Sequence, residues 1–176
     1  VPTYNMEKYL DKCLTSLIIE DIELLKRIEV LVIIDGATDR SSEIAHTYQD
    51  SYPDTFRVVD KENGNYGSCI NRGLKEATGK YIKILDADDW FDTKAFHKYI
   101  ETIIDIDCDL ILNNCDVVDE QEDVTRSFDI DFIETNKYVG FDQIQNSCLV
   151  NLQMHCAAYR TELIRNINEK QKEYKK

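Results

Sequence analysis

The sequence predicts an α/β domain whose central sheet is mostly parallel and flanked by helices. Residues 30–34 form an apolar, largely β-branched run without polar alternation, which is typical of a strand covered on both faces of a parallel sheet. Predicted strands alternate with predicted helices along the first two thirds of the chain, as in βαβ units. The 176 residues suffice for one domain with a sizeable core and are too few for two full domains.

The elements are predicted in the following order. Apolar residues recur with helical spacing after Asn5, whose side chain can cap the first free amides of a helix over residues 6–20. A strand at 29–35 then ends in the turn Asp35-Gly36. The next elements are a helix at 41–52, a strand at 56–59, a helix at 66–78 closed by Gly79, and a strand at 80–85.

The later part of the chain continues this alternation and then loses it. A helix at 93–104, capped by Asp92, precedes a strand at 109–112. Residues 116–136 are acidic and poorly periodic, which predicts a loop or an edge hairpin. Helices are expected again at 141–149 and from 161 onward, and the polar tail at 166–176 is expected to fray.

The charge of the chain excludes several classes of partner. Twenty-one basic and 34 acidic residues give a net charge of −13, and no basic stripe interrupts the acidic sequence before its last few residues. A phosphate lattice would therefore be repelled, so we expect no nucleic acid partner and no anionic membrane surface. A polyphosphate ligand requires a metal ion that screens its charge.

Hydropathy and cysteine usage predict a cytoplasmic protein. No apolar run approaches the roughly 20 residues that span a bilayer, so we expect no transmembrane segment, and no secretory leader is recognisable. Six cysteines lie far apart without a C-x-x-C pair: Cys13, Cys69, Cys108, Cys115, Cys148 and Cys156. This spacing favours buried free thiols in a reducing compartment over a zinc site or disulfides.

The acidic run Asp86-Ala87-Asp88-Asp89 is the sharpest chemical feature. It follows a predicted strand, and residues two apart on an extended backbone point the same way, so Asp86 and Asp88 can present two carboxylates at the sheet edge. Ligands of open α/β sheets bind at that edge, and Mg²⁺ or Mn²⁺ prefers carboxylate oxygens. The alternative is an acidic loop that caps the next helix.

Three further segments can contribute to the same edge. Asp35 follows another strand, and its carboxylate could accept a hydrogen bond from a base N–H, although Asp and Gly are also ordinary turn residues. The segments that contain Thr3-Tyr4-Asn5 and Asn63 each lead into a helix and can offer backbone amides or an aromatic face to a nucleotide. A glycine-containing loop alone is a weak indication of a nucleotide site, and both segments could equally be ordinary connecting loops.

Taken in this order, the segments resemble the family 2 glycosyltransferases with the GT-A fold. Residues 1–5 are similar to the family's P-x-Y-N segment and residues 32–39 to its V-D-D-G-S-x-D segment. Residues 71–74 are similar to its N-x-G-L, and residues 79–89 to its G-x-Y-I-x-x-L-D-A-D-D. The segment Met154-His155 with residues 159–163 is similar to a segment of bacterial members that build cell-surface polysaccharides. Beyond Trp90 the resemblance is thinner.

The resemblance implies a reaction and assigns roles to matching positions. Members transfer a sugar from a nucleoside diphosphate donor, here a UDP-sugar, to an acceptor hydroxyl of a glycan or lipid-linked molecule, usually with inversion. Residues 1–112 correspond to the nucleotide-sugar-binding part and 113–176 to a partial acceptor-side part. The implied donor-binding residues are Thr3, Tyr4, Asn5, Asp35, Asn63, Asp86 and Ala87, and the implied ligands of Mn²⁺ or Mg²⁺ are Asp88 and Asp86.

The sequence also departs from the family pattern. Ile34 replaces the first of the family's two aspartates, Ala37 replaces a serine, and Ile70 replaces an arginine that many members carry, so these positions bear on donor identity. His155 could reach the metal or diphosphate, but a structural role is favoured. Trp90 could form the floor of the acceptor site, but a role in the hydrophobic core is favoured. No catalytic base is assigned, and Asp142 and Glu134 are fallback candidates outside any recognised motif.

Other functions and an incomplete enzyme are also considered. A nucleotidyltransferase would carry a glycine-rich basic loop near its start, and a dinucleotide-dependent oxidoreductase a G-x-G-x-x-G after a strand; neither is found. A donor-binding module without turnover is the rival from another class. The chain enters the family pattern at the end of its first strand and stops soon after residue 163, so we expect it to bind donor but to turn over poorly. The full-length protein could lie peripherally at the inner face of the membrane.

Overall fold

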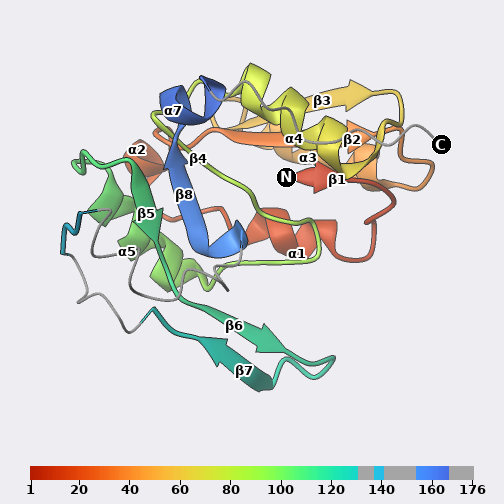
Figure 1. Ribbon diagram of the computed structural model, residues 1–176. Helices are drawn as coiled ribbons and strands as arrows, with labels where there is room; N and C mark the ends of the chain where they lie inside the picture. Colours follow the sequence, from red (N-terminus) through yellow and green to blue (C-terminus); the bar gives the residue numbers. More distant parts are fainter. Residues whose placement is uncertain (131–136, 141–153, 167–176) are drawn as a thin grey trace.

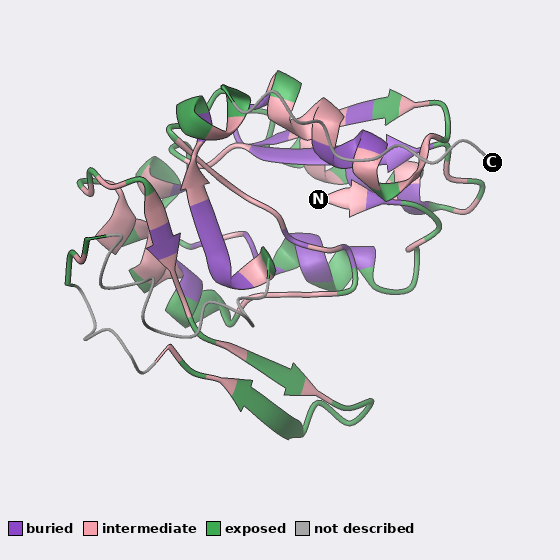
Figure 2. Ribbon diagram, viewed as in Figure 1, coloured by how far each residue is buried: buried purple, intermediate pink, exposed green. Residues whose placement is uncertain are grey.

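The computed structural model describes residues 1–130, 137–140 and 154–166, and its strands form two three-stranded sheets and a hairpin (Figure 1). The first sheet is parallel, with the order β1 (Pro2–Thr3), β2 (Val30–Asp35) and β3 (Phe56–Lys61). Every residue of β2 is buried, as the absence of polar alternation predicts. Figure 2 shows this strand as a continuous buried segment at the centre of the sheet.

Helices cover both faces of this parallel sheet. They are α1 (Leu10–Thr15), α2 (Ile22–Leu25), α3 (Ser41–Ser51) and α4 (Asn65–Glu76). Helix α5 (Thr93–Ile103) contributes Phe96 to the apolar core beneath this sheet. Val32 of β2 packs in one apolar cluster with residues of α1, α3 and α5, whereas Ile33 packs in a second cluster with Cys69 of α4. Neighbouring β2 side chains therefore face opposite helix layers. The α/β fold class is confirmed.

The second sheet contains a strand that the sequence did not predict. Its order is β4 (Tyr81–Lys83), β8 (Ala157–Arg160) and β5 (Leu110–Leu112), and β8 is antiparallel to both neighbours. Ala157 and Ala158 are fully buried between β4 and β5. Because alanine is a poor strand former in isolation, burial between two existing strands decides the conformation of this segment.

The remaining described elements lie beside this sheet. They are the hairpin β6 (Cys115–Val118) and β7 (Val124–Phe128), the 3₁₀ turn η2 (Met154–Cys156) and α7 (Thr161–Arg165). The hairpin projects from the body of the molecule, and most of it is exposed (Figures 1 and 2). It confirms a hairpin within the predicted range 116–136, but as a separate two-stranded sheet and not at the edge of another sheet, and residues 131–136 lie outside the described residues. The helix predicted at 141–149 lies outside the described residues.

Several predicted boundaries and caps are wrong. The helix predicted over residues 6–20 is confined to α1, and the Asn5 side chain accepts a hydrogen bond from the Thr38 amide instead of capping that helix. Helix α4 ends with Ala77 at its cap position rather than at Gly79. Strand β4 ends at Lys83 rather than at residue 85. Asp92 does cap α5, since its carboxylate accepts from the Ala95 amide at 2.8 Å.

An apolar cavity of about 440 Å³ lies between the two sheets. Its lining comes from both sheets and from α4 and α5, and includes Ile33, Ile70, Ile82, Phe96 and Ile103. Among the described strands, β1 and β4 are not hydrogen-bonded to each other, so the two sheets meet through side chains. The helices of the described part of the chain are all too short or too polar to cross a membrane.

Candidate functional site

The candidate site lies where β2 and β3 end and where the segment after β4 begins. The Asp35 and Lys61 residues at the carboxyl ends of β2 and β3 are register partners in the parallel sheet. Helix α4, which starts shortly after β3, carries Tyr66, and its hydroxyl donates to Asp86 Oδ1 at 2.7 Å. This hydrogen bond brings the acidic segment after β4 to the edge where ligands of α/β sheets bind.

The acidic segment is a tight turn rather than the extended backbone on which the prediction for Asp86 and Asp88 relied. The Asp89 amide donates to the Asp86 carbonyl at 3.0 Å, which places Ala87 and Asp88 at the two central positions of a β-turn. The argument that two-residue spacing on a strand aligns Asp86 with Asp88 is therefore wrong. Ala87 is buried and Asp88 is exposed. The methyl group of Ala87 therefore anchors the turn, and the Asp88 carboxylate faces solvent.

Burial and charge act on the residues around this turn. Burial, together with the neighbouring Asp88 and Asp86 carboxylates, raises the pKa of Asp89, and the opposing effect of His155 is smaller than that of burial. Burial and the hydrogen bond to Asp86 likewise raise the pKa of Tyr66, so this phenol is a neutral donor at physiological pH. The turn thus gathers three carboxylates that repel one another unless a cation lies among them.

Asp35 is buried in an ion pair that the sequence did not predict. Lys61 Nζ contacts Asp35 Oδ1, and the side chains of Asp35 and Lys61 are only 3% and 16% exposed. The Gly64 amide donates to the same oxygen at 2.9 Å, and Asn63 Nδ2 donates to the Asp35 carbonyl at 2.9 Å. The predicted residues Asp35 and Asn63 are therefore brought together. Asp35 fixes the loop that leads into α4.

The first predicted segment is divided between core and surface. Thr3 is 1% exposed and its hydroxyl donates to the Val1 carbonyl, whereas Tyr4 is 43% exposed at the end of β1. Asn5 adopts a positive φ of 53° and holds the Thr38 amide at 2.8 Å. Tyr4 is thus available to a ligand from solvent, while Thr3 and Asn5 shape the backbone on either side of it.

The donor atoms of the turn fit a hard divalent cation. Asp86 and Asp88 offer carboxylate oxygens, the ligands that Mg²⁺ and Mn²⁺ prefer. In the part of the chain that the structure describes, these acids do not belong to a group of three His, Cys, Asp or Glu ligands close enough to enclose an ion. A cation held by these two acids would need further ligands, which the phosphate oxygens of a bound molecule could supply.

Trp90, considered for the acceptor site, and His155, considered for the metal or diphosphate, lie beside the turn. The Trp90 ring is partly buried and lies under the ammonium of Lys12, 3.2 Å from the ring centroid. His155 Nδ1 lies 3.7 Å from Asp89 Oδ2. Lys12 also pairs with Glu122 in the tip of the β6–β7 hairpin at 2.6 Å, so the hairpin is tied to this side of the molecule.

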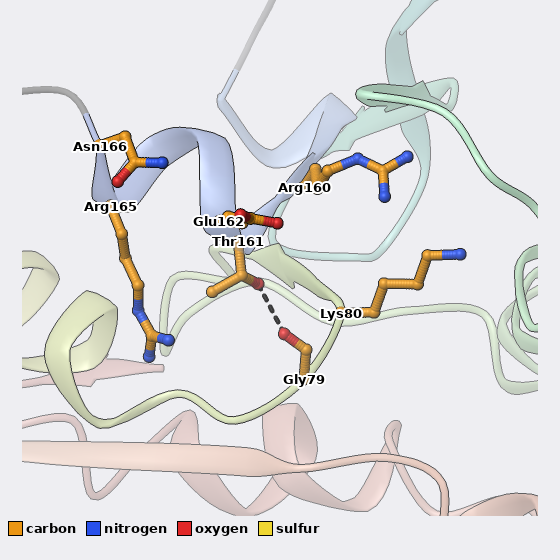
Figure 3. Close-up of a pocket in the computed structure, with 7 residues that line it drawn as sticks. All are labelled: Gly79, Lys80, Arg160, Thr161, Glu162, Arg165 and Asn166. Atoms are coloured by element: carbon orange, nitrogen blue, oxygen red, sulfur yellow. Dashed lines mark hydrogen bonds between the residues drawn. The ribbon is translucent and has the colours of Figure 1, made fainter.

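A second hollow of about 300 Å³ lies at the other end of β4 and is a poor ligand site. Figure 3 shows its lining, and Thr161 Oγ1 donates to the Gly79 carbonyl at 2.7 Å within it. Its three cations already have partners, because Lys80 and Arg160 pair with Asp107 and the Arg165 guanidinium donates to carbonyls at the end of α4. These contacts join α7 to α4. They give the segment Tyr159 to Leu163, which is similar to a segment of bacterial family members, a structural role.

Sequence reasoning missed two contributors to the site. Lys61 was overlooked, although a lysine that ends the strand after β2 is a recognisable signal once the parallel register is assumed. The contact between Tyr66 and Asp86 joins residues 20 positions apart, and no local pattern predicts it.

Comparisons with known proteins agree with this geometry. The family model described as "Glycosyl transferase family 2" matches residues 1–167. The putative glycosyltransferase EpsH of Bacillus subtilis (strain 168) is 32% identical over 135 residues, which cover 77% of this chain and 37% of EpsH. The minor teichoic acid biosynthesis protein GgaB of the same organism is 34% identical over 100 residues, 57% of this chain and 11% of GgaB.

Solved structures show the same fold. The crystal structure of S. aureus TarS 1-349 in complex with UDP-GlcNAc superposes with a TM-score of 0.72 and 28% identity, covering 94% of this chain and 45% of TarS 1-349. The chain thus spans less than half the length of these relatives. The parallel sheet, the acidic turn that Tyr66 of α4 holds and the family match over nearly the whole chain lead to one assignment: this chain belongs to glycosyl transferase family 2.

Proposed function

We propose that this chain binds the UDP-sugar donor of a metal-dependent transferase that moves a sugar to an acceptor hydroxyl, with inversion, in cell-surface polysaccharide synthesis. The observation that carries the proposal is the Asp86–Asp89 turn, held by Tyr66 beside the carboxyl ends of β2 and β3. The UDP-GlcNAc complex of TarS, which shares the fold at 28% identity, supports a uridine nucleotide as donor.

Asp88 and Asp86 would hold Mn²⁺ or Mg²⁺. Asp88 is exposed, so its carboxylate is open to a cation from solvent. One carboxylate oxygen of Asp86 accepts a hydrogen bond from the Tyr66 hydroxyl. When bound, the cation supplies Lewis-acid stabilisation of the charge on the departing diphosphate. Tyr66 orients Asp86 through a neutral donor, and Ala87 fixes the turn through its buried methyl group.

The base and ribose would lie over the loops that end β1 and β2. Tyr4 offers an exposed ring for the base, and a base N–H would hydrogen-bond the Asp35 carboxylate, whose Oδ1 already accepts from Lys61 and the Gly64 amide. The side chains of Thr3, Asn5 and Asn63 hold the backbone of these loops through hydrogen bonds. Loss of a charge-assisted hydrogen bond to Asp35 would cost roughly 1.5–3 kcal/mol of nucleotide affinity.

The acceptor side is proposed only in outline. Trp90, His155 and the hairpin tip lie beside the acidic turn, where a glycan or lipid-linked acceptor would approach. Asp142 and Glu134 lie outside the described residues, and we assign no catalytic base. The five cysteines of the described ranges are free thiols, which supports a reducing, cytoplasmic setting.

Calorimetric titration of UDP tests the proposal. In MnCl₂ the chain should bind UDP at least about tenfold more tightly than in EDTA, a difference of about 1.4 kcal/mol. Asp88→Asn should abolish most of that difference because it removes one of the two proposed metal ligands. Asp105→Asn, which neutralises an exposed acid after α5, is the matched control and should leave the difference intact.

The outcomes separate the parts of the proposal. Equal affinity in MnCl₂ and EDTA would refute the metal site while leaving donor binding in place. Failure to bind UDP or UDP-GlcNAc under either condition would refute the donor site itself.

A further inference from the structure

A cluster of soft metal ligands lies next to the acidic turn and is separate from it. The ligand atoms of Cys115, His155 and Cys156 all lie within 4.8 Å of one another. Cys115 begins β6, whereas the other two residues belong to η2, so the cluster joins segments 41 residues apart in the sequence. The two sulfur atoms are 2.9 Å apart, and Cys156 is 2% exposed.

The backbone around the cluster is held in place by a dense set of hydrogen bonds. Lys83 Nζ donates to the His155 carbonyl at 2.6 Å and to Asn113 Oδ1 at 2.7 Å. The Asn113 amide donates to the Cys156 carbonyl at 2.9 Å. These contacts fix the start of β6 against η2, so the thiols and the imidazole are brought together before any ligand binds, which lowers the entropic cost of binding.

The chemistry of the three ligands selects a soft or borderline cation. Thiolates with an imidazole are typical Zn²⁺ ligands, whereas Mg²⁺ and Mn²⁺ prefer oxygen. Zn–S bonds of about 2.3 Å in a tetrahedral site place two sulfur atoms roughly 3.8 Å apart. The two sulfur atoms now lie 2.9 Å apart. Cys115, which is only partly buried, would therefore have to move outward by less than about 1 Å to reach the tetrahedral spacing.

The charges around the cluster are compatible with such an ion. A bound Zn²⁺ would displace the protons of both thiols, and the two thiolates would balance its charge, so the nearby Lys83 ammonium would face a neutral site rather than a bare cation. His155 Nδ1 lies 3.7 Å from Asp89 Oδ2. A small shift would let His155 donate to this carboxylate through one ring nitrogen and bind the metal through the other, as ligating histidines commonly do.

We propose that Cys115, Cys156 and His155 form a zinc site, with Asp89 as the outer carboxylate that orients His155. The ion pins the β6–β7 hairpin to η2 and, through His155 and Asp89, to the turn that carries Asp86 and Asp88. This site differs in ligands and in metal from the acidic turn. It does not depend on the donor-binding function proposed above.

Cobalt substitution is the direct test, because Co²⁺ bound to thiolates absorbs strongly in the near ultraviolet and oxygen-bound Co²⁺ does not. The reduced chain, stripped of metal, should bind one equivalent of Co²⁺ with this charge-transfer absorption, and Zn²⁺ should displace it stoichiometrically. Cys115→Ser and His155→Gln should each abolish or sharply weaken the absorption. Asp89→Asn should keep it but lower Zn²⁺ affinity roughly 10–100-fold.

Matched variants separate this site from its surroundings. Cys108→Ser removes another partly buried thiol and should leave the absorption unchanged, and Asp88→Ala should do the same because it changes only the acidic turn. Circular dichroism of Cys115→Ser checks that the variant is folded, and Cys115 is chosen over the buried Cys156 for that reason.

Two results would overturn the proposal. Cobalt that binds without thiolate absorption and is lost in Asp88→Ala would show that the acidic turn is the metal site. A Cys115–Cys156 disulfide, found by mass spectrometry as a cross-linked peptide lacking two hydrogens, with no Zn²⁺ uptake after reduction, would show that the pair reacts with an oxidant rather than a metal.

Discussion

Single residues at the site serve the fold as well as the ligand, and Asp35 is the clearest example. Its carboxylate neutralises the buried Lys61 ammonium and accepts the Gly64 amide, so it holds the end of β2 to the loop before α4. A residue assigned to a nucleotide from its motif is therefore also required for local stability. Any loss of binding in an Asp35 variant must be separated from loss of structure.

Removing Asp35 should therefore destabilise the chain by an amount typical of a broken buried pair. We expect Asp35→Ala to lower the free energy of unfolding in urea by about 3 kcal/mol, because the largely buried Lys61 side chain loses its carboxylate partner. Replacing Lys61 by Met in the same chain should recover part of this loss. Glu23→Ala breaks the exposed pair with Lys26 and should cost much less, because solvent already screens that pair. Equal losses of unfolding free energy in Asp35→Ala and Glu23→Ala would contradict the argument that burial sets the cost of breaking an ion pair.

At the scale of elements, two glycines place opposite demands on the backbone. Gly36, in the turn after β2, has a φ of +65°, and an added Cβ would lie 2.9 Å from the Asn63 backbone nitrogen. Gly73 lies inside α4, where an added Cβ would meet no atom within 4 Å. The first glycine allows two loops of the site to approach closely, whereas the second only weakens its helix.

Alanine at these two positions should therefore change stability in opposite directions. Gly36→Ala should lower the free energy of unfolding by more than about 1 kcal/mol, because it is strained in φ and collides with backbone. Gly73→Ala should raise it by roughly 0.5–1 kcal/mol through helix propensity. Urea denaturation followed by circular dichroism measures both. Destabilisation by Gly73→Ala would show that the open space beside it is needed for packing.

At the scale of the whole molecule, the net charge of −13 acts against a nucleotide ligand. The acids of the turn add to this field where the diphosphate would bind. Salt shortens the Debye length from about 30 Å at 0.01 M to about 8 Å at 0.15 M, so it screens the repulsion. The charge thus predicts how binding responds to ionic strength.

UDP affinity in EDTA should consequently increase by roughly two- to threefold between 10 and 150 mM salt. With saturating Mn²⁺ the increase should disappear, because the cation neutralises the local field. Uridine, which carries no phosphate, is the control ligand and should show no trend. Weaker UDP binding at the higher salt concentration in EDTA would mean that local cations such as Lys61, rather than the overall charge, dominate the site.

The sequence alone determined the elements whose signals are local. The unbroken apolar run predicted β2 buried on both faces, and Asp92 predicted the start of α5. The order and spacing of the motifs predicted the family, whereas Asp35 and the acidic turn follow strands of two different sheets and not of the one sheet that the sequence predicted. The predictions of local elements succeed because propensity, capping and alternation act between residues close in the chain.

Tertiary structure alone decided the contacts that join distant segments. Strand β8 is a strand because β4 and β5 hydrogen-bond it on both sides, and its alanines give no strand signal themselves. Lys61 reaches Asp35 only through the parallel register, and Cys115 meets Cys156 only because Lys83 and Asn113 hold η2 against β6. The spacing of the cysteines predicted free thiols but gave no sign that Cys115 and Cys156 meet, because spacing along the chain carries no information on which segments lie together.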